Sequence, residues 1–337
     1  GYYVYRYYTP VFTSVDLSSV TKLGTDAFAY CRELTAVKLG SGLTAIADRA
    51  FMNCAALADI DLSHVISVGD NAFAEAGLTE IHLPACTDIG KYAFYSNLNL
   101  TKVTLAEGIK VAEGAFSYSD KLADADLSKV AYVGDYSFAF TALTDLDLSA
   151  AAYVGTQAFL KESVTDVTVK LGEVLTDLGD NPFAMCRVSA FMGETVENFN
   201  GKDYVVLTDT YDVSETVRVI GGSLYRVVPN GLELITFAPL KDQKTFTVAG
   251  GTTRVSEMAC AGTDVTYVVL PDTLMAVGHK AFYACDNLTT VAFSSSTRPL
   301  CLGMPNLVGK SLRKCPMIFM GKVSTAGRPL CSILHLP

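Results

Sequence analysis

The chain contains 337 residues, of which 50% are hydrophobic and 18% are charged, so it can bury a large continuous core. Its 26 lysines and arginines against 35 aspartates and glutamates give a net charge of −9, which argues against nucleic acid as the main partner because phosphate binding relies on clustered basic side chains. No stretch approaches the roughly 18 uninterrupted apolar residues of a membrane span.

We predict an N-terminal cap over residues 1–11. This segment holds a run of tyrosines, Tyr2, Tyr3, Tyr5, Tyr7 and Tyr8. A ring with a polar tip suits a partly wet edge, and a tyrosine patch that binds carbohydrate or protein is the alternative. No signal peptide is visible at the start, and we interpret Gly1 as a remnant left after removal of a leader.

A repeat begins at residue 12. Phenylalanine returns every 21 to 24 residues through most of the chain, at Phe28, Phe51, Phe73, Phe94, Phe116, Phe138, Phe159 and Phe183, and again at Phe282. Between these residues lie phrases such as Leu34–Leu39 (Leu-Thr-Ala-Val-Lys-Leu), in which apolar and polar residues alternate as a strand requires. One strand phrase per fixed period predicts a solenoid.

Each coil is expected to hold one strand and one short helical turn. The predicted strands are 12–17, 34–39, 57–62, 78–83, 100–105, 122–127, 143–148, 164–169, 243–248, 265–270 and 288–293, stacked in parallel as one long sheet on the concave side. Leu43 and Ile46 then line the opposite wall. Ala50, Phe51 and Cys54 follow at the spacing i, i+1, i+4, which favours a short helical turn facing the core.

Two further repeat positions hold small residues. Four residues before the phenylalanine lie Gly24, Gly69, Gly90, Gly134, Gly155, Gly179 and Gly278, with Ala47, Ala112 and Ser256 as substitutes. This pattern indicates a need for small size more than for positive φ. Three residues after it lie Cys31, Cys54, Cys186 and Cys285, replaced elsewhere by Ala76, Asn97, Ser119 and Thr141. With an odd total of nine cysteines and no CxxC pair, we expect buried thiols; a metal site or disulfide is the second choice.

The recurring phrase Ile/Val-Gly-x-x-Ala-Phe-x-x-Cys-x-x-Leu-x-x-Val-x-Leu resembles the BspA-like leucine-rich repeat family of bacterial and protozoan surface proteins. The resemblance covers residues 12–294 apart from one interruption. It implies an α/β solenoid: a curved right-handed coil with the long parallel sheet on its concave side and short helical turns opposite. It also implies a cell-surface or secreted location and adhesion to extracellular-matrix-type proteins.

The period breaks once and then resumes. Residues 12–187 form the first block of repeats, and residues 188–242 form an irregular segment that we expect to dock on the solenoid. Within it, two apolar runs flank Asn230-Gly231, which predicts a hairpin between Leu224 and Phe237. Repeats resume over 243–294, where Cys260 takes the phenylalanine position, so the core there should be thinner or filled from the hairpin. Residues 295–337 are expected to form a C-terminal cap and basic tail.

The sequence offers no catalytic constellation. The histidines His64, His82, His279 and His335 belong to different coils, and no Ser-His-Asp set or HExxH phrase can be assembled. We therefore expect neither an enzyme nor a cofactor or metal.

Acidic residues on outward strand positions are the main candidates for a binding surface. They are Asp59, Asp61, Glu80, Asp124, Asp126, Asp145, Asp147 and Asp166. Neighbouring strands lie about 4.8 Å apart, so these carboxylates should form an acid column on the concave face. A solvated surface is the first interpretation. Recognition of a basic protein segment is the second, and weak binding of a divalent cation is the third.

From these observations we expect a non-catalytic, adhesin-like binding protein at the cell surface or outside the cell that recognises a protein partner. A structural scaffold of the cell envelope, or a glycan-binding module, is the alternative. An aromatic patch on the concave face would favour capture of protein or glycan, whereas an all-polar face would favour electrostatic docking or a purely structural role.

Overall fold

The computed structural model describes residues 11–189, 191, 193–199, 202–240 and 243–294. The chain divides into two compact units, one comprising residues 1–161 and 170–174 and the other residues 162–169 and 175–337. Most of the expected N-terminal cap and all of the expected C-terminal cap lie outside the described residues, so both stay predictions. The two units are described separately below.

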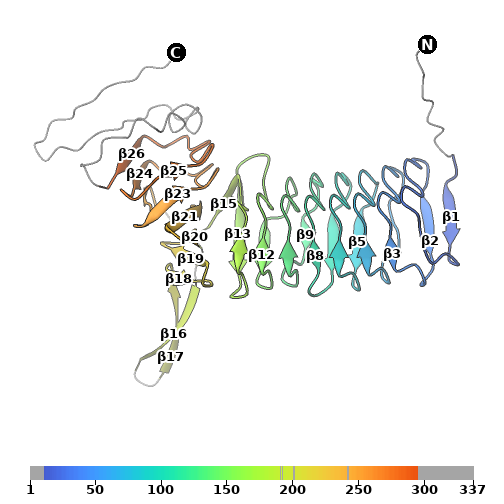
Figure 1. The fold of residues 1–337 in the computed structure, drawn as a ribbon, viewed down its shortest axis with the longest axis horizontal. Helices are drawn as coiled ribbons and strands as arrows, with labels where there is room; N and C mark the ends of the chain where they lie inside the picture. Colours follow the sequence, from blue (N-terminus) through green and yellow to red (C-terminus); the bar gives the residue numbers. More distant parts are fainter. Residues whose placement is uncertain (1–10, 190, 192, 200–201, 241–242, 295–337) are drawn as a thin grey trace, which may run out of the picture. The chain divides into compact units, whose positions relative to one another are not determined.

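The first unit is a solenoid of parallel strands, as the repeat predicts, but each full coil carries a second short strand (Figure 1). The first row contains β1 (Ser14–Leu17), β2 (Ala36–Leu39), β5 (Glu80–Leu83), β7 (Lys102–Leu105), β9 (Asp124–Ala125) and β11 (Asp145–Leu148). The second row contains β3 (Ala45–Ile46), β4 (Ser67–Val68), β6 (Asp88–Ile89), β8 (Lys110–Val111), β10 (Tyr132–Val133) and β12 (Tyr153–Val154).

The second row is held by one inward residue in each coil. Ile46, Val68, Ile89, Val111, Val133 and Val154 are register partners from coil to coil and are all buried. Their neighbours point outward, from Ala45 through Lys110 to Tyr153. The expected opposite wall is therefore a continuous ladder of two-residue strands.

The first row does not form the one long sheet that the sequence predicts. Strands β1 and β2 pair together, β5, β7 and β9 form another sheet, and residues 57–62 form no strand. Aspartate is a poor strand former, and both outward positions of that segment are aspartates, Asp59 and Asp61. The segment 122–127 shares this feature and keeps only the two residues of β9, although β11 forms in full with the same pattern.

The expected helical turns are wrong, because no helix occurs among the described residues, and the α/β class is wrong with them. The backbone N–H groups of Arg49, Phe51 and Asn53 donate forward to carbonyls of the next coil, at 2.9, 2.8 and 2.7 Å. The intervening Ala50 and Met52 donate to the third residue before them. A helix would need every N–H bonded within its own segment, whereas here alternate groups join one coil to the next.

This alternation requires left-handed backbone at two positions of the turn. Arg49 and Asn53 have φ of 53° and 58°, and other coils repeat this pattern. The glycine position is different: Gly69 and Gly155 lack positive φ, but a Cβ would lie 2.7 Å from the Asp48 nitrogen and 2.4 Å from the Asp135 nitrogen, respectively. The prediction that this position demands small size is confirmed.

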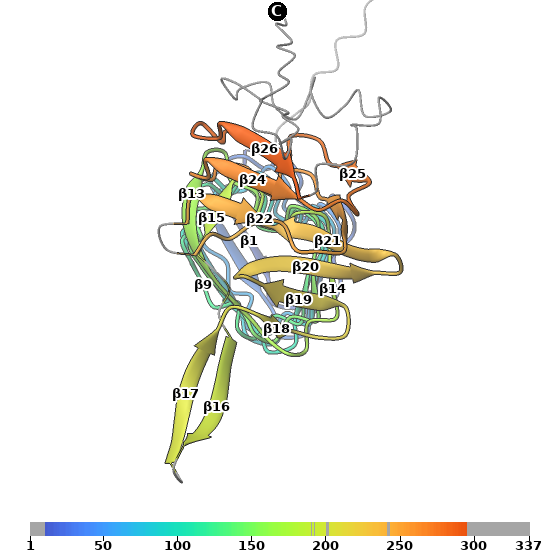
Figure 2. The ribbon, with the colours of Figure 1, turned by 90° about the vertical axis from the view of Figure 1, so that its left-hand side faces the viewer.

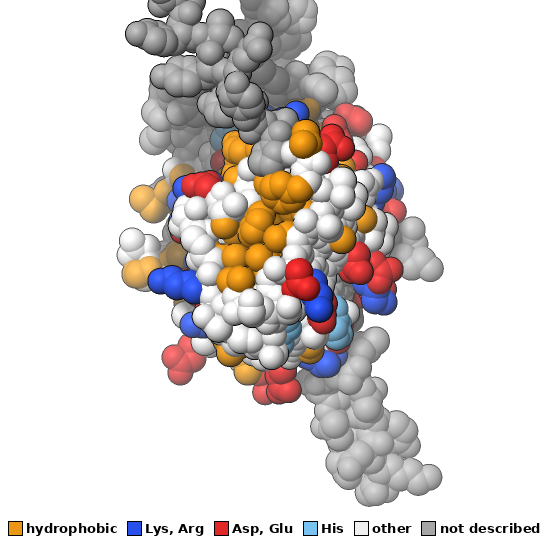
Figure 3. All heavy atoms as spheres, turned by 90° about the vertical axis from the view of Figure 1, so that its right-hand side faces the viewer, with side chains coloured by type: hydrophobic (Ala, Val, Ile, Leu, Met, Phe, Trp, Pro, Cys, Tyr) orange, Lys and Arg blue, Asp and Glu red, His pale blue; other side chains and the backbone are white. Residues whose placement is uncertain are grey.

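A column of stacked phenylalanines fills the core of the first unit. The rings of Phe28, Phe51, Phe73, Phe94, Phe116, Phe138 and Phe159 follow one another with centroids 5.2 to 5.6 Å apart and planes within 10° of parallel. From Phe51 to Phe159 these side chains are fully buried. The expectation that Phe51 faces the core is confirmed, and the phenylalanines of the neighbouring coils stack on it. At the end formed by the first coil, hydrophobic side chains gather at the surface (Figure 3). Val11 and Phe12, which precede β1 in the chain, are 82% and 38% exposed.

The small position after the phenylalanine also has a hydrogen-bonding role. Cys54 Sγ donates to the Phe28 carbonyl at 3.1 Å, Asn97 Nδ2 to Phe73 at 2.8 Å and Ser119 Oγ to Phe94 at 3.3 Å. The residue therefore caps a carbonyl of the preceding coil. Cys31, Cys54, Cys186 and Cys285 are all buried, and none of the described cysteines forms a disulfide, as predicted.

The second unit begins with strand β13 (Thr165–Leu171), whose last residues belong to the first unit, and continues with β14 (Asp177–Leu178) and β15 (Cys186–Val188). Thr165 of β13 pairs in parallel with Cys186 of β15. Next, β16 (Gly193–Phe199) and β17 (Lys202–Thr208) form an antiparallel hairpin (Figure 2).

The remaining strands of the second unit form two sheets. One has the order β18 (Tyr211–Asp212), β19 (Val217–Ile220), β20 (Ser223–Val228), β21 (Gly231–Thr236), β23 (Thr252–Val255) and β25 (Ala276–Val277). The other has the order β22 (Thr245–Thr247), β24 (Tyr267–Leu270) and β26 (Thr290–Phe293). None of the described segments of either unit forms a helix long and apolar enough to cross a membrane.

The predicted hairpin at Asn230-Gly231 is confirmed, with β20 and β21 antiparallel and Val228 facing Gly231. Strand β21 then pairs in parallel with β23 of the resumed repeats, so the irregular segment continues the solenoid wall. Tyr225 and Phe237 from this segment share one buried cluster with Cys260. The irregular segment thus contributes side chains to the core around Cys260.

The phenylalanine column yields a stability prediction. We expect Phe116→Ala to lower the free energy of unfolding by about 3–5 kcal/mol, because the rings on both sides cannot close the cavity. Urea unfolding followed by circular dichroism measures this change. The exposed Asp120→Ala in the same coil should stay within about 0.5 kcal/mol. A Phe116→Ala loss as small as that of the control would contradict the column.

The buried cysteines yield a reactivity prediction. Burial raises the pKa of Cys54 to about 12 and that of Cys86 to about 11. Because the thiolate is the reactive form, both should resist iodoacetamide at pH 8 in the native protein and react after denaturation. Mass spectrometry of the labelled peptides reports each site. If titration of denatured, unreduced protein shows that a pair of these buried thiols is missing, an oxidative crosslink replaces this interpretation.

Candidate interaction surface

The structure places the predicted acidic residues of the first unit on the outward side of the first strand row, but basic residues lie among them. Lys102 sits in register between Glu80 and Asp124, with its Nζ 2.6 Å from Asp124 Oδ2. Lys170 approaches Asp147 to 3.1 Å, and Lys129 approaches Asp126 to 3.9 Å. In the second unit, Arg187 pairs with Asp166 at 3.1 Å. The row is therefore charged with both signs and contains no aromatic residue.

Several of these aspartates also close turns. Asp61, Asp126 and Asp147 accept a hydrogen bond from the backbone N–H of the serine two residues later, at 3.0, 3.1 and 3.0 Å. Hydrogen bonds from Ser63 and Ser128 lower the pKa of Asp61 and Asp126. Partial burial raises the pKa of Asp147, but bonds from Ser149 and Lys170 outweigh it and the net shift is downward. These carboxylates thus have a structural role at the strand ends.

The described residues contain no group of three or more His, Cys, Asp or Glu side chains that could hold a metal ion. His82 lies on the exposed face of β5, and His279 Nδ1 lies 3.3 Å from Glu257 Oε1. His335 lies outside the described residues. Nothing in these arrangements resembles a nucleophile and base pair.

A chain of aromatic side chains runs along the turn face of the first unit, outside the buried column. We call Tyr92, Tyr95, Tyr118 and Phe140 the aromatic ridge. Their ring centroids follow one another at 5.9, 5.4 and 4.4 Å. Tyr118 is 46% exposed, and the other members are partly exposed. The ridge spans three successive coils.

The ridge residues stand at positions that favour other amino acids. Tyr92, Tyr118 and Phe140 have φ of 55°, 60° and 59°, in the left-handed region. Left-handed backbone costs a side-chain-bearing residue roughly 1–2 kcal/mol, and glycine or asparagine is the usual occupant. Other coils hold Gly114, Asn71 and Asn53 at the two left-handed positions, but also charged or polar side chains such as Arg49, Glu75 and Gln157. Bulky aromatic residues at strained, exposed positions point to a role in binding.

Polar groups fix one end of the ridge. The Tyr92 hydroxyl donates to Glu113 Oε1 at 2.8 Å, and Lys91 Nζ donates to Glu113 Oε2 at 3.0 Å. The bond to Glu113, together with burial, raises the pKa of Tyr92 to about 12. Tyr92 therefore stays a neutral donor whose ring is held in one orientation beside Tyr95.

Sequence reasoning missed the ridge. The signal was present, because Tyr30, Tyr118 and Phe140 each follow the repeat phenylalanine by two residues. A helical turn at this segment does not predict left-handed backbone, so these aromatic residues were not recognised as a separate exposed row. The acidic residues were found because strand alternation alone assigns them to the outside, whereas their pairing with bases depends on register.

Comparison with known proteins identifies the repeat. A family model described as "BspA type Leucine rich repeat region (6 copies)" matches residues 1–123, 66–190 and 236–301, more than half of the chain. No curated protein matches the chain.

Solved structures of similar proteins include a leucine rich cell surface protein from Faecalibacterium prausnitzii A2-165, with 18% identity, 68% of this chain and 71% of that chain covered, and a TM-score of 0.43. A leucine-rich repeat protein from Bacteroides ovatus ATCC 8483 shares 14% identity over 83% of this chain and 78% of that chain, with a TM-score of 0.39. One from Eubacterium ventriosum ATCC 27560 shares 20% identity over 64% and 60%, with a TM-score of 0.41.

The left-handed positions yield a prediction. Tyr30 has φ of 62°, is 44% exposed and occupies the same repeat position as Tyr118 and Phe140, but lies outside the ridge. We expect Tyr30→Asn to leave the free energy of unfolding unchanged or to raise it by up to about 1 kcal/mol, because asparagine adopts this conformation more readily. Urea unfolding tests this, and a loss above that size would show that the tyrosine stabilises the fold.

Proposed function

The chain belongs to the BspA-type leucine-rich repeat family, and on this basis we propose that it is a non-catalytic binding protein whose aromatic ridge contacts a protein partner. The observation that carries the proposal is the chain of at least partly exposed rings, three of which stand at left-handed positions. Tyrosine is enriched at the centres of protein interfaces, because it offers a large apolar area and loses little conformational entropy.

The ring geometry favours a protein over a glycan. Tyr118 and Phe140 stack with centroids 4.4 Å apart and planes 29° from parallel, so each covers part of the face of the other. A ridge of partly exposed aromatic rings suits insertion into a hydrophobic groove of a partner. A glycan that stacks on open ring faces finds less surface here.

The acid column contributes to the proposal as a steering surface. Asp59, Asp61, Glu80, Asp124, Asp126, Asp145 and Asp147 give one side of the first unit an excess of negative charge, even with Lys102 among them. Exposed charges of this kind change association rates more than affinity. The partner is accordingly expected to carry basic residues. Asp166, in the second unit, is held by Arg187 and is the weakest candidate.

The location, the adhesin-like role and the type of partner are proposed from membership of the family. We infer a cell-surface or secreted location, an adhesin-like role and a partner of the extracellular-matrix type. A structural role in the cell envelope without any such ligand is the competing hypothesis. It predicts that changes on the ridge leave every binding measurement unchanged.

The test is a binding screen of the full chain against immobilised matrix proteins and glycans at two salt concentrations. For a protein that binds, Tyr118→Asn combined with Phe140→Asn should weaken affinity by about 30-fold or more, the scale of an interface hot spot. Asparagine suits the left-handed backbone, so the fold should be retained. Tyr30→Asn, the same change at the same repeat position outside the ridge, should bind as the wild type does.

Charge is tested in the same screen. Asp145→Asn combined with Asp147→Asn should slow association and leave dissociation nearly unchanged, and binding should weaken as salt rises, because exposed charges are screened over about 8–10 Å at physiological ionic strength. If affinity does not respond to either the ridge variant or the charge variant, neither surface is the binding site.

A further inference from the structure

A separate feature of the second unit is a buried carboxylate bound by two arginines. The Glu233 side chain is only 4% exposed. Its Oε2 accepts a hydrogen bond from Arg226 Nη1 at 2.9 Å, and its Oε1 accepts one from Ser256 Oγ at 2.8 Å and lies 3.0 Å from Arg254 Nε. A carboxylate removed from water needs such compensation, and Glu233 is fully supplied.

The two arginines differ in how many of their guanidinium N–H groups are bonded to the protein. Arg226 Nη2 donates to the Leu178 and Gly179 carbonyls, and Arg226 Nη1 also lies 3.6 Å from Asp180, so this side chain is enclosed. Arg254 is 51% exposed, and its Nη1 and Nη2 groups donate to none of the described residues. The Arg254 guanidinium therefore forms an ion pair with Glu233 through Nε and is half exposed to solvent.

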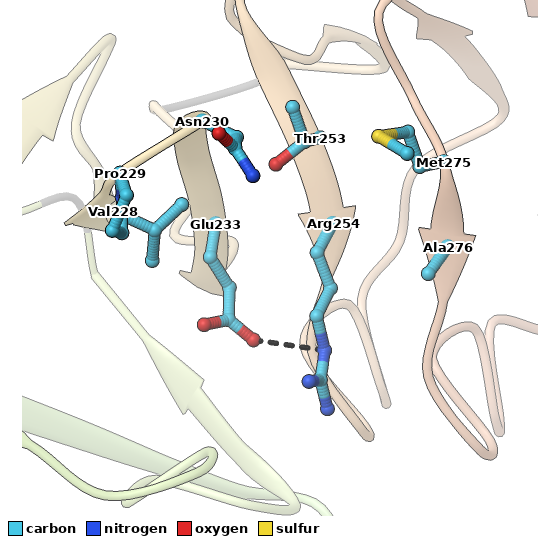
Figure 4. Close-up of a pocket in the computed structure, with 8 residues that line it drawn as sticks. All are labelled: Val228, Pro229, Asn230, Glu233, Thr253, Arg254, Met275 and Ala276. Atoms are coloured by element: carbon cyan, nitrogen blue, oxygen red, sulfur yellow. Dashed lines mark ion pairs between the residues drawn. The ribbon is translucent and has the colours of Figure 1, made fainter.

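Arg254 is one of the residues that line a pocket of about 310 Å³, together with Val228, Pro229, Asn230, Glu233, Thr253, Met275 and Ala276 (Figure 4). Glu233, Arg254 and Ala276 come from the neighbouring strands β21, β23 and β25 and are register partners across them. Across these three strands, the acidic Glu233 is thus followed by the basic Arg254 and then by the methyl group of Ala276. Beside Ala276 stands Met275, which is 70% exposed, on the same strand side of the pocket.

We propose that this pocket binds a carboxylate, which lies beside Ala276, the register neighbour of Arg254, and accepts a bidentate hydrogen bond from the Arg254 guanidinium. The fork of a guanidinium matches the two oxygens of a carboxylate. A single negative charge fits better than the two of a phosphate, because the buried Glu233 carboxylate lies on the other side of Arg254. The site belongs to the second unit and is independent of the aromatic ridge.

The probe is isobutyrate, a branched carboxylate, compared with isobutyramide, its uncharged analogue. Protein with ¹⁵N-labelled arginine reports binding through the side-chain resonances of Arg254, which Arg254→Lys identifies by their loss. We expect isobutyrate to shift these resonances saturably and isobutyramide to leave them in place. A short peptide with a free carboxyl terminus, compared with the same peptide amidated, then distinguishes a chain end from a free acid as the source.

Substitution of the neighbouring alanine gives the sharpest test. Ala276→Glu places a carboxylate of the chain itself beside Arg254 and should weaken isobutyrate binding by at least about tenfold. Ala276→Ser leaves the space open and should bind within about threefold of the wild type. Arg218→Ala removes an exposed arginine that pairs with Asp212 elsewhere in the unit and should have no effect.

Three results would overturn the proposal. The first is an equal response to isobutyramide, which would show that charge is not recognised. The second is unchanged isobutyrate binding in a folded Ala276→Glu protein, as judged by circular dichroism. The third is a non-saturating response, or tighter binding of inorganic phosphate, which would leave only adventitious contact or a general anion site.

Discussion

The hydrogen bonds that join each turn segment to the next coil are the constraint on which the rest of the first unit depends. Alternate N–H groups, such as those of Arg49, Phe51 and Asn53, donate to the following coil at 2.7 to 2.9 Å. This ladder fixes the spacing between coils, and with it the stacking of phenylalanine rings 5.2 to 5.6 Å apart. It also brings backbone so close that Gly69 and Gly155 have no room for a Cβ.

The same ladder sets the chemical choices at each repeat position. The phenylalanine must be large because stacked rings fill the core without gaps. The position three residues later must be small, and where its side chain can donate, as in Cys54, Asn97 and Ser119, it caps a carbonyl of the preceding coil. Left-handed positions accept many residues at some cost, which leaves them open to functional use. Three residues of the aromatic ridge stand at such positions, where the fold sets the backbone conformation but the partly exposed side chain can vary in type.

The parts of the structure that were predicted correctly depend on volume and alternation, which a sequence displays directly. The strands at Glu80–Leu83 and Lys102–Leu105 and the column through Phe116 are of this kind. The turn at Ala50–Cys54 was mistaken for a helix because the spacing i, i+1, i+4 also fits a turn whose alternate N–H groups bond to a neighbouring coil. The second strand row escaped notice because two residues, such as Tyr132–Val133, are too few to show alternation. The Glu233 cluster could not be predicted, since its members meet only through register.

Register also decides what a charge does in this fold. In the first unit, Lys102 stands beside Asp124 with side chains 48% and 63% exposed, so the pair contributes at most about 1 kcal/mol and serves mainly to keep like charges apart. In the second unit, Glu233 occupies an equivalent place in a strand row but is nearly excluded from water. Removing a partner there would leave a buried charge uncompensated, which is far more costly. Removing one partner of a charge pair in register is therefore expected to cost little stability at the surface and much more in the interior. Arg254 combines both situations, because it pairs with the buried Glu233 while half of its own side chain stays in solvent.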